Sequence, residues 1–557
     1  MSTPYETAIG SWTGRSTFFW AATGATVGLS NLWKFPYLAG ANGGGLFVLL
    51  YLGCLLLVTL PLMLTETALG RTARNGIVLA MGGVARRIGR SAHWTWVGRF
   101  SVLAGFLVLS FTAVIGAICL AYVFYSALGF FNGTSEQDVA HTLTSLVENP
   151  NGQRSFMIWH ASFLILVAIV SVQGVVDGLE RAFRVVMPAL LILLLGLFCY
   201  SYEFGDLTRA VDFMLRFHPE EVTWRSLQLA LAHAFYTLGL GMGVWVIFGA
   251  YMPSFTPLKR SVFAVALMDT LIAIVAGLTI YGLVFARSGG GEPSQGFGLV
   301  FLDLPASLST APGGQFVATA MFVAILLVAW TTSLALLEPV VGWFREWVGG
   351  PRGWSAAMMV IAAWVAGLGT LFSFNIWSDM TLAGGTLFRW IEILTGGLLI
   401  PLVSIALAIF VGWVLREQRA LTMIGRAPGW IAGIWFWVIK LVLPPVILFI
   451  GIHYAVISLG ALCDDGKQAD WCPGGSSGPI EHPAMPTPHT TGITPSEEQP
   501  VDELSPEGAA VSGPEPDSAA LPTTTRGDTG RSLKHEKTET VPTDDAPHGR
   551  DLLYDSV

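Results

Sequence analysis

Long runs of apolar residues alternate with short polar segments through most of the chain. A helix needs about 20 apolar residues to cross the hydrocarbon core of a bilayer, and eleven runs approach that length. The first and the sixth are not clean helices. The pattern predicts an all-α polytopic membrane protein with spans near 16–38, 45–69, 97–128, 156–172, 185–203, 226–251, 261–286, 315–345, 354–375, 386–415 and 429–462.

The composition excludes a soluble globular protein. Hydrophobic residues make up 53% of the 557 residues and charged residues only 12%, whereas soluble domains carry about 25% charged residues. The formal net charge of −8 is misleading as a global property, because acidic residues crowd the C-terminal stretch. We therefore expect no nucleic-acid partner, and lipid as the surroundings. The polar first 15 residues lead into a run without a small-residue cleavage site, so no removable signal peptide is expected.

Loop charges predict how the chain is oriented. Arginine and lysine follow predicted spans 2, 4, 6 and 10, whereas the loop at 129–155 is acidic. Because positive loops stay cytoplasmic, we expect a cytoplasmic segment at 1–15, a membrane domain at 16–462 in the cell (plasma) membrane, and a C-terminus outside. The acidic, Pro- and Thr-rich stretch 463–557 cannot bury enough apolar area to fold and is expected to be disordered. The sequence is compatible both with a disulfide between Cys463 and Cys472 and with two separate cysteines there.

Two predicted spans contain dense glycine at mid-membrane depth. Residues 24–31 read Gly-Ala-Thr-Val-Gly-Leu-Ser-Asn, and residues 237–243 read Thr-Leu-Gly-Leu-Gly-Met-Gly. Glycine disfavours helix, and the backbone groups it frees must find partners inside the bilayer. The stretches open corresponding five-span halves, so we expect two broken helices that face each other around a small cavity for a cation and an anionic group. Close helix packing is the alternative use of the glycines.

Side-chain oxygens accompany these breaks. They come from Thr26, Asn31 and Thr237 in the breaks, from Asp269 in span 7, and from residues 331–333 in span 8, which read Thr-Thr-Ser. Such hard ligands suit alkali or alkaline-earth cations, and no His or Cys cluster beside them suggests a transition metal. The chain offers no nucleotide loop and no nucleophile with a base, so neither an enzyme nor an organic cofactor is expected.

These features accompany motifs that resemble the neurotransmitter:sodium symporters, of the bacterial amino-acid transporter type. The resemblance runs from about Trp12 to Leu462. It implies an inverted five-plus-five helix repeat (the LeuT-type fold), one extra helix and the disordered tail. The motifs are Gly28-Leu29-Ser30-Asn31-Leu32-Trp33-Lys34-Phe35-Pro36-Tyr37, Asn42-Gly43-Gly44-Gly45, Pro61-Leu62 with Glu66, Gly70-Arg71, Gly178-Leu179-Glu180-Arg181, Met187-Pro188, the glycine run at 237–243 and Thr331-Thr332-Ser333.

The function implied by the resemblance is sodium-coupled secondary transport of a small organic solute by alternating access. An amino acid is the favoured solute. A transport-deficient membrane receptor or scaffold that keeps the fold is the alternative. The sequence is compatible with both a monomer and a homo-oligomer.

The resemblance also implies two sodium sites. Asp269 stands where many relatives have asparagine, and a fixed carboxylate there could replace a mobile chloride, so we expect chloride-independent transport. A local cap or pair is the alternative role of Asp269. The first site would use the Thr26 carbonyl with the side chains of Asn31, Thr237 and Asp269, and the second the carbonyls of Gly24, Val27 and Val328 with the hydroxyls of Thr331 and Thr332.

The implied solute pocket departs from the family pattern at several positions. Gly28 replaces the aspartate of amine carriers, which favours a solute with its own carboxylate. Thr112 replaces a tyrosine that holds this carboxylate in almost all relatives, and the Tyr236 hydroxyl could compensate. Helix packing is the alternative role of Met242 and Leu336. The expected lining is Ala25, Thr26, Leu29, Ser30, Thr112, Tyr236, Thr237, Gly239, Met242, Thr332 and Leu336.

Two gates follow from the same resemblance. Lys34 and Glu392 match the extracellular gate pair, and Arg389, one turn before Glu392, would compete with Lys34 for it. Trp12 and Tyr251 match the cytoplasmic plug. Ile9 stands where that gate has its arginine, so the inner gate departs from the pattern.

Overall fold

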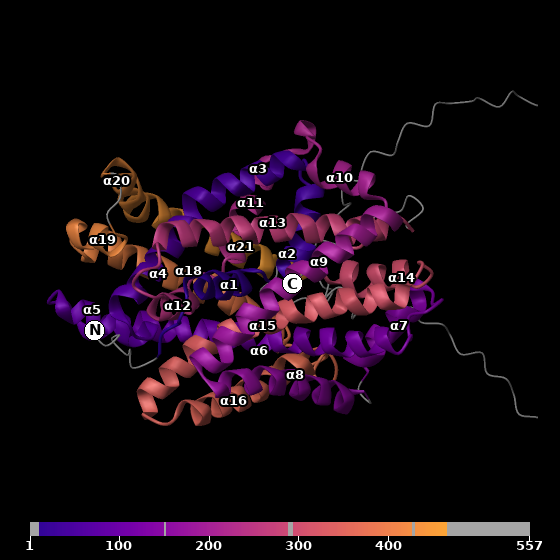
Figure 1. Ribbon diagram of the computed structural model, residues 1–557, viewed down its shortest axis with the longest axis horizontal. Helices are drawn as coiled ribbons and strands as arrows, with labels where there is room; N and C mark the ends of the chain where they lie inside the picture. Colours follow the sequence, from indigo (N-terminus) through magenta and orange to yellow (C-terminus); the bar gives the residue numbers. More distant parts are fainter. Residues whose placement is uncertain (1–9, 150–151, 288–292, 426–428, 465–557) are drawn as a thin grey trace, which may run out of the picture. The chain divides into compact units, whose positions relative to one another are not determined.

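The chain is helical in its described part, which in this computed structural model comprises residues 10–149, 152–287, 293–425 and 429–464 (Figure 1). Only two isolated β-bridges, Gly44 with Phe217 and Leu382 with Gly385, interrupt the helical pattern of these residues. Nine helical stretches within them are long and apolar enough to cross a membrane: Gly45–Ala73, Ala92–Ala127, Gln153–Gln173, Val175–Phe204, Leu258–Phe285, Gly314–Val348, Arg352–Ser373, Leu387–Val414 and Gly429–Cys463.

The other two predicted spans are broken helices. Helix α1 (Arg15–Thr26) ends before α2 (Ser30–Gly40) begins, and α11 (Trp224–Thr237) ends before α12 (Val244–Tyr251). In the second break Gly239, Gly241 and Gly243 have φ values of +62°, +74° and +78°, a region that side chains other than glycine rarely adopt. The predicted interruption of both segments is therefore confirmed.

The nine continuous stretches include several π-helical turns. Such turns are rare and usually mark a local adjustment of a longer helix. In chain order the elements are α3 (Gly45–Cys54), η1 (Leu55–Thr59), α4 (Leu60–Ala73), η2 (Ala92–Trp94), α6 (Thr95–Ala127), α8 (Gln153–Gln173), η3 (Val175–Glu180), α9 (Arg181–Phe204), α13 (Leu258–Phe285), α15 (Gly314–Val348), α16 (Arg352–Ser373), α17 (Leu387–Glu392), η6 (Ile393–Leu399), α18 (Ile400–Ile409), η7 (Phe410–Val414), α20 (Gly429–Trp437), η8 (Val438–Val442) and α21 (Leu443–Asp464).

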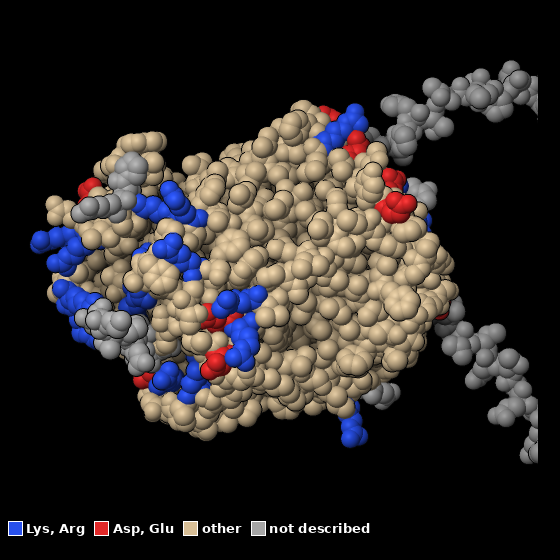
Figure 2. All heavy atoms as spheres, in the orientation of Figure 1, with Lys and Arg blue, Asp and Glu red and all other residues tan. Residues whose placement is uncertain are grey.

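Shorter elements connect these stretches. They are α5 (Ile77–Arg87), α7 (Glu136–Val147), α10 (Leu207–Leu215), η4 (Pro219–Glu221), η5 (Leu299–Asp303), α14 (Leu304–Leu308) and α19 (Glu417–Met423). Lysine and arginine side chains gather at the end that carries α5 and α19, and few charges interrupt the wide face between this end and α10 (Figure 2). Large apolar side chains such as Ile192 and Phe316 are exposed. An uncharged, apolar outer face suits contact with lipid.

The extra helix ends in a bonded cysteine. Cys463 is engaged in a disulfide, whereas Cys54, Cys119 and Cys199 are free. The helix extends two residues past the predicted end of the membrane domain at 462, to Asp464. Cys472 and the rest of the predicted tail lie outside the described residues.

Glycines let α4 and α12 approach each other closely. A Cβ atom on Gly70 would lie 1.8 Å from the Val246 carbonyl oxygen, and one on Gly249 would lie 2.2 Å from the Thr67 carbonyl oxygen. Both obstacles are backbone atoms, which cannot rotate away. The inner half of the second broken helix is therefore fixed against α4 by backbone contact.

We expect Gly70→Ala to destabilise the protein by about 1–3 kcal/mol, because the added methyl group overpacks a backbone contact. Gly196 in α9 is the matched control, since no atom lies within 4 Å of its added Cβ, and alanine there should be neutral or stabilising. Thermal unfolding of the detergent-purified protein measures both variants. Equal midpoints for the two variants would contradict the proposed contact.

Candidate functional site

The two helix breaks meet at a buried cluster of side-chain oxygens. The Asn31 amide at the start of α2 donates to Asp269 Oδ1 of α13 at 2.8 Å. The hydroxyl of Thr237, the last residue of α11, lies 3.2 Å from Asn31 Oδ1 and 3.4 Å from Asp269 Oδ2. All three residues are buried. The Thr26 side chain also lies within hydrogen-bond reach of Asp269, so the structure brings together all four residues expected at the first sodium site.

The second expected site lies where α15 passes the end of α1. The Thr332 hydroxyl donates to the Val27 carbonyl at 3.2 Å. The neighbouring Thr331 hydroxyl donates to the Val328 carbonyl at 3.1 Å and to the Leu327 carbonyl at 3.0 Å. Hydroxyls and carbonyls from two helices therefore converge at this point, although they are far apart in the sequence.

The end of α1 supplies further oxygens. Because α1 stops at Thr26, the carbonyls of its last turn lack amide donors further along the helix. Gly24 and Thr26 belong to this turn, and no backbone donor to their carbonyls is found among the described residues. Unpaired carbonyls at this depth must find another partner.

This donor set fits sodium. It consists of carbonyl, amide, hydroxyl and carboxylate oxygens, which are hard ligands. No group of three or more His, Cys, Asp or Glu side chains in the described part of the chain could hold a metal ion. Only Asp269 brings a full negative charge to the two clusters, which favours a monovalent cation.

Several residues at the breaks are partly exposed beside buried oxygen donors. Ala25, Ser30, Tyr236, Gly239 and Thr332 are partly exposed, whereas Thr26, Thr237 and Thr331 beside them are buried. The partly exposed residues come from α1, α2, α11, α15 and the second break. Partly exposed residues from five elements therefore lie at the two breaks, at the expected solute position.

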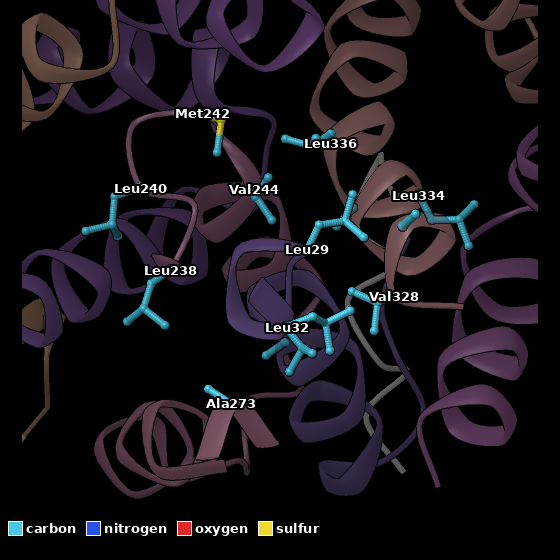
Figure 3. Close-up of a cluster of buried hydrophobic side chains, with 14 of the residues drawn as sticks. Leu29, Leu32, Leu238, Leu240, Met242, Val244, Ala273, Val328, Leu334 and Leu336 are labelled. Carbon is cyan, nitrogen blue, oxygen red and sulfur yellow. The ribbon is translucent and has the colours of Figure 1, made fainter. Parts of the chain in front are cut away.

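Buried apolar side chains lie at the same two breaks. Figure 3 shows Leu29 at the first break, Met242 in the second and Leu336 on α15. A Cβ atom on Gly239 would lie 3.3 Å from the Met242 methyl carbon, so the thioether side chain reaches toward that glycine. Thr112 of α6 is buried with 8% of its surface exposed, and no hydrogen bond of its hydroxyl is found among the described residues.

The Tyr236 hydroxyl is already engaged. It donates to the Gly396 carbonyl of η6 at 2.7 Å. Its single proton is therefore unavailable to a solute carboxylate in this arrangement, although its oxygen can still accept. The expected compensation for Thr112 would require this bond to break.

The expected outer gate pair is not formed. Glu392 accepts from Arg389 Nη1 at 2.9 Å through Oε2 and from the Tyr454 hydroxyl at 3.0 Å through Oε1. Lys34 is exposed, and it makes no ion pair with any described residue. Arg389 therefore holds the carboxylate, as the expected competition allows. Tyr454, on the extra helix, was not predicted to take part.

The inner path is closed by buried contacts. The Trp12 amide donates to the Tyr251 carbonyl at 3.0 Å, and the two rings lie 5.5 Å apart. The Tyr251 hydroxyl donates to Glu338 of α15, whose carboxylate also accepts from Arg352 at 2.8 and 2.6 Å. Sequence reasoning missed Glu338 and Arg352. A carboxylate inside span 8 was the available signal, because such a group needs a partner. Ile9 lies outside the described residues.

Two further carboxylates hold the chain around this site. Glu180, at the end of η3, accepts from the Thr13 amide at 3.0 Å and from the Thr17 hydroxyl at 2.8 Å. Glu66 of α4 accepts from the Gly241 amide at 2.9 Å, and Ser101 of α6 donates to the Gly241 carbonyl at 2.8 Å. The second break is thereby fixed from both sides. Both carboxylates occur in the family motifs, although no role was assigned to them.

Comparisons with known proteins agree with this arrangement. The model of the Sodium:neurotransmitter symporter family matches residues 9–131 and 136–463. The uncharacterized sodium-dependent transporter YhdH of Bacillus subtilis is 30% identical over 448 residues, which cover 79% of this chain and 96% of that protein.

Two other comparisons name a solute. A crystal structure of MhsT in complex with L-phenylalanine matches with a TM-score of 0.71 and 30% identity, covering 80% of this chain and 99% of that one. The mouse neutral and basic amino acid transporter B(0+) is 24% identical over 60% of this chain and 62% of its own length.

Glu338→Ala and Arg352→Ala should each be strongly destabilising, by about 3–5 kcal/mol, because each leaves a buried charge without its partner. The double variant should lose less than the sum of the two. Thermal unfolding measures this coupling. The pair Asp177–Arg181 is the control, since it lies 3.5 Å apart on the surface and should couple by less than about 1 kcal/mol. Additive losses at 338 and 352 would contradict the buried pair.

Proposed function

Because the chain belongs to the sodium:neurotransmitter symporter family, we propose that it is a sodium-coupled symporter of an amino acid. The coupling to sodium follows from the family, and the chain is a multi-pass membrane transporter with the LeuT-type fold. The amino acid, two sodium sites, independence from chloride and location in the plasma membrane are our proposals. One observation supports them: hard oxygen donors from the two breaks lie close together, next to partly exposed residues of the same elements.

Two features of the expected solute position support an amino acid. Gly28 places no carboxylate against a solute ammonium group, so a solute that carries its own carboxylate is favoured. The carboxylate would approach the cluster of Asn31, Thr237 and Asp269, where sodium, when bound, supplies positive charge. Leu29, Met242 and Leu336 would contact an apolar side chain, and flexible methionine adapts to ligands of different shape.

Asp269 supports independence from chloride. Its carboxylate is buried and accepts hydrogen bonds from neutral donors, Asn31 and Thr237, while no described cation forms an ion pair with it. A buried charge in this position requires a positive partner. A cation at the first cluster would satisfy it without a mobile anion.

The two gates support alternating access. Trp12, Tyr251 and Glu338 are buried and linked to Arg352, as an inner gate in its closed form would be, whereas Lys34 is exposed at the expected outer gate. The proposed solute and cation sites lie between the two breaks. The inner path would stay closed until both sites are occupied. Release of solute and cation on the inner side would accompany separation of Glu338 from Arg352 as α1, α2, α4, α11, α12 and α13 tilt against the other helices.

Sodium should raise the thermal midpoint of the purified protein above its value in potassium or choline. A ligand at 100 times its dissociation constant stabilises the native state by about 2.7 kcal/mol. Thr331→Val should reduce the sodium-specific shift. Ser333→Ala should retain it, because that hydroxyl donates to the Ala329 carbonyl at 2.8 Å and is not an expected ligand. Absence of any sodium-specific shift would favour the alternative of a transport-deficient scaffold.

Sodium-driven uptake into proteoliposomes, tested with a panel of amino acids and amines, should proceed equally in chloride and gluconate. Asp269→Asn should reduce uptake in gluconate about 10-fold or more, because a hydrogen bond to a charged group contributes about 1.5–3 kcal/mol. Chloride should restore part of this loss. Chloride-dependent uptake by the parent protein would refute the assigned role of Asp269, and uptake of amines alone would refute the amino-acid solute.

A further inference from the structure

We propose that Arg389 and Tyr454 form a latch that keeps the outer gate open by holding the Glu392 carboxylate away from Lys34. The inference rests on the proposed transport function. Both residues are positioning residues, since neither is among the residues expected to contact the solute. The latch assigns a role in gating to α21, which stands outside the five-plus-five repeat.

Each carboxylate oxygen of Glu392 already accepts a hydrogen bond from a residue other than Lys34. It ends α17 with only 7% of its surface exposed, and each of its carboxylate oxygens accepts one hydrogen bond, from Arg389 and from Tyr454. The guanidinium of Arg389 is also buried at 8% exposure. An ion pair with so little contact with water is weakly screened by salt. The latch is therefore a persistent competitor for the gate carboxylate.

Lys34 makes no direct ion pair with Glu392, although the two charges interact at longer range. It lies on α2 beyond the first break, is exposed, and makes neither an ion pair nor a hydrogen bond with the described residues. A lysine ammonium has three donors, which water satisfies while the outer path is open. Closure would require Glu392 to exchange its present partners for Lys34, or to accept Lys34 as a third.

A glycine makes room for the tyrosine. A Cβ atom on Gly396 would lie 2.7 Å from Tyr454 Cε1 and 3.1 Å from its hydroxyl oxygen. Tyr236 reaches the same residue from α11 through its bond to the Gly396 carbonyl, and the two tyrosine rings lie 5.4 Å apart. Gly396 thus joins the latch to the first half of the second broken helix, which also carries residues expected at the solute position.

The latch predicts how the gate responds to its loss. Tyr454→Phe removes one of the two bonds without changing the ring, so the Glu392 carboxylate becomes available to Lys34. The closed population should rise, and the apparent affinity for external solute should fall in proportion to the fraction that remains open. The KM for external solute should rise about 10-fold, as expected when one hydrogen bond to a charged group is lost.

The decisive test places Tyr454→Phe in two backgrounds. With Lys34 present, KM in sodium-driven proteoliposome uptake should rise. With Lys34→Gln, the same substitution should leave KM unchanged, because the competing partner is absent. Tyr200→Phe is the control: its hydroxyl donates to the Pro312 carbonyl at 2.7 Å on a different part of the chain, and its KM should equal that of the parent. Equal effects of Tyr454→Phe in both backgrounds, or none in either, would overturn the latch.

A second measurement keeps the test independent of transport. A cysteine at Ser30, with Cys54, Cys119 and Cys199 replaced by serine, should react with a membrane-impermeant thiol reagent from outside. Tyr454→Phe should slow this reaction, and Lys34→Gln should restore its rate. Restoration of the rate, combined with no transport by the parent protein, would support the latch and refute the proposed function. An unchanged reaction rate on Tyr454→Phe would refute the latch whatever the transport result.

Discussion

Backbone hydrogen bonding inside a bilayer is the constraint on which this structure depends. Hydrocarbon offers no water to satisfy an N–H or C=O group, so a helix can stop at mid-depth only where other groups replace its missing bonds. Glu66 and Ser101 satisfy the amide and carbonyl of Gly241 in the second break. At the first break the α1 carbonyls face hydroxyls of α15. The proposed cation positions thus lie where groups of neighbouring helices replace the backbone hydrogen bonds that are lost at the two helix breaks.

The two gates close in physically different ways. On the inner side, one carboxylate receives a two-pronged arginine contact and a tyrosine hydroxyl, all buried. At the other gate, the carboxylate of Glu392 is bonded to Arg389 of its own helix and to Tyr454 of the extra helix, and Lys34 is exposed. Under the proposed function, this asymmetry corresponds to an outward-facing state, with the inner gate held by a buried network and the outer gate not yet paired.

The sequence predicts the membrane fold, the place of both breaks and the family, because these depend on composition and on short motifs. Asn31, Thr237 and Asp269 meet as expected, since the family motifs fix their relative positions. Glu338 and Arg352 were missed because their pairing depends on how α15 turns into α16. Tyr454 was missed because no local pattern indicates that α21 contacts Gly396. The predicted number of eleven spans combines nine continuous stretches of the described residues with two broken ones, and it stays a prediction.

The bond between Glu180 and the Thr13 main chain bears on which positions can vary in evolution. The N–H at position 13 belongs to the backbone, and every residue except proline would keep it. Position 180 offers no such latitude, because a carboxylate of this length must also reach Thr17. Serine should therefore be tolerated at position 13, since it keeps the hydroxyl that also donates to Glu180, whereas proline at 13 and aspartate at 180, shorter by one methylene, should be rare.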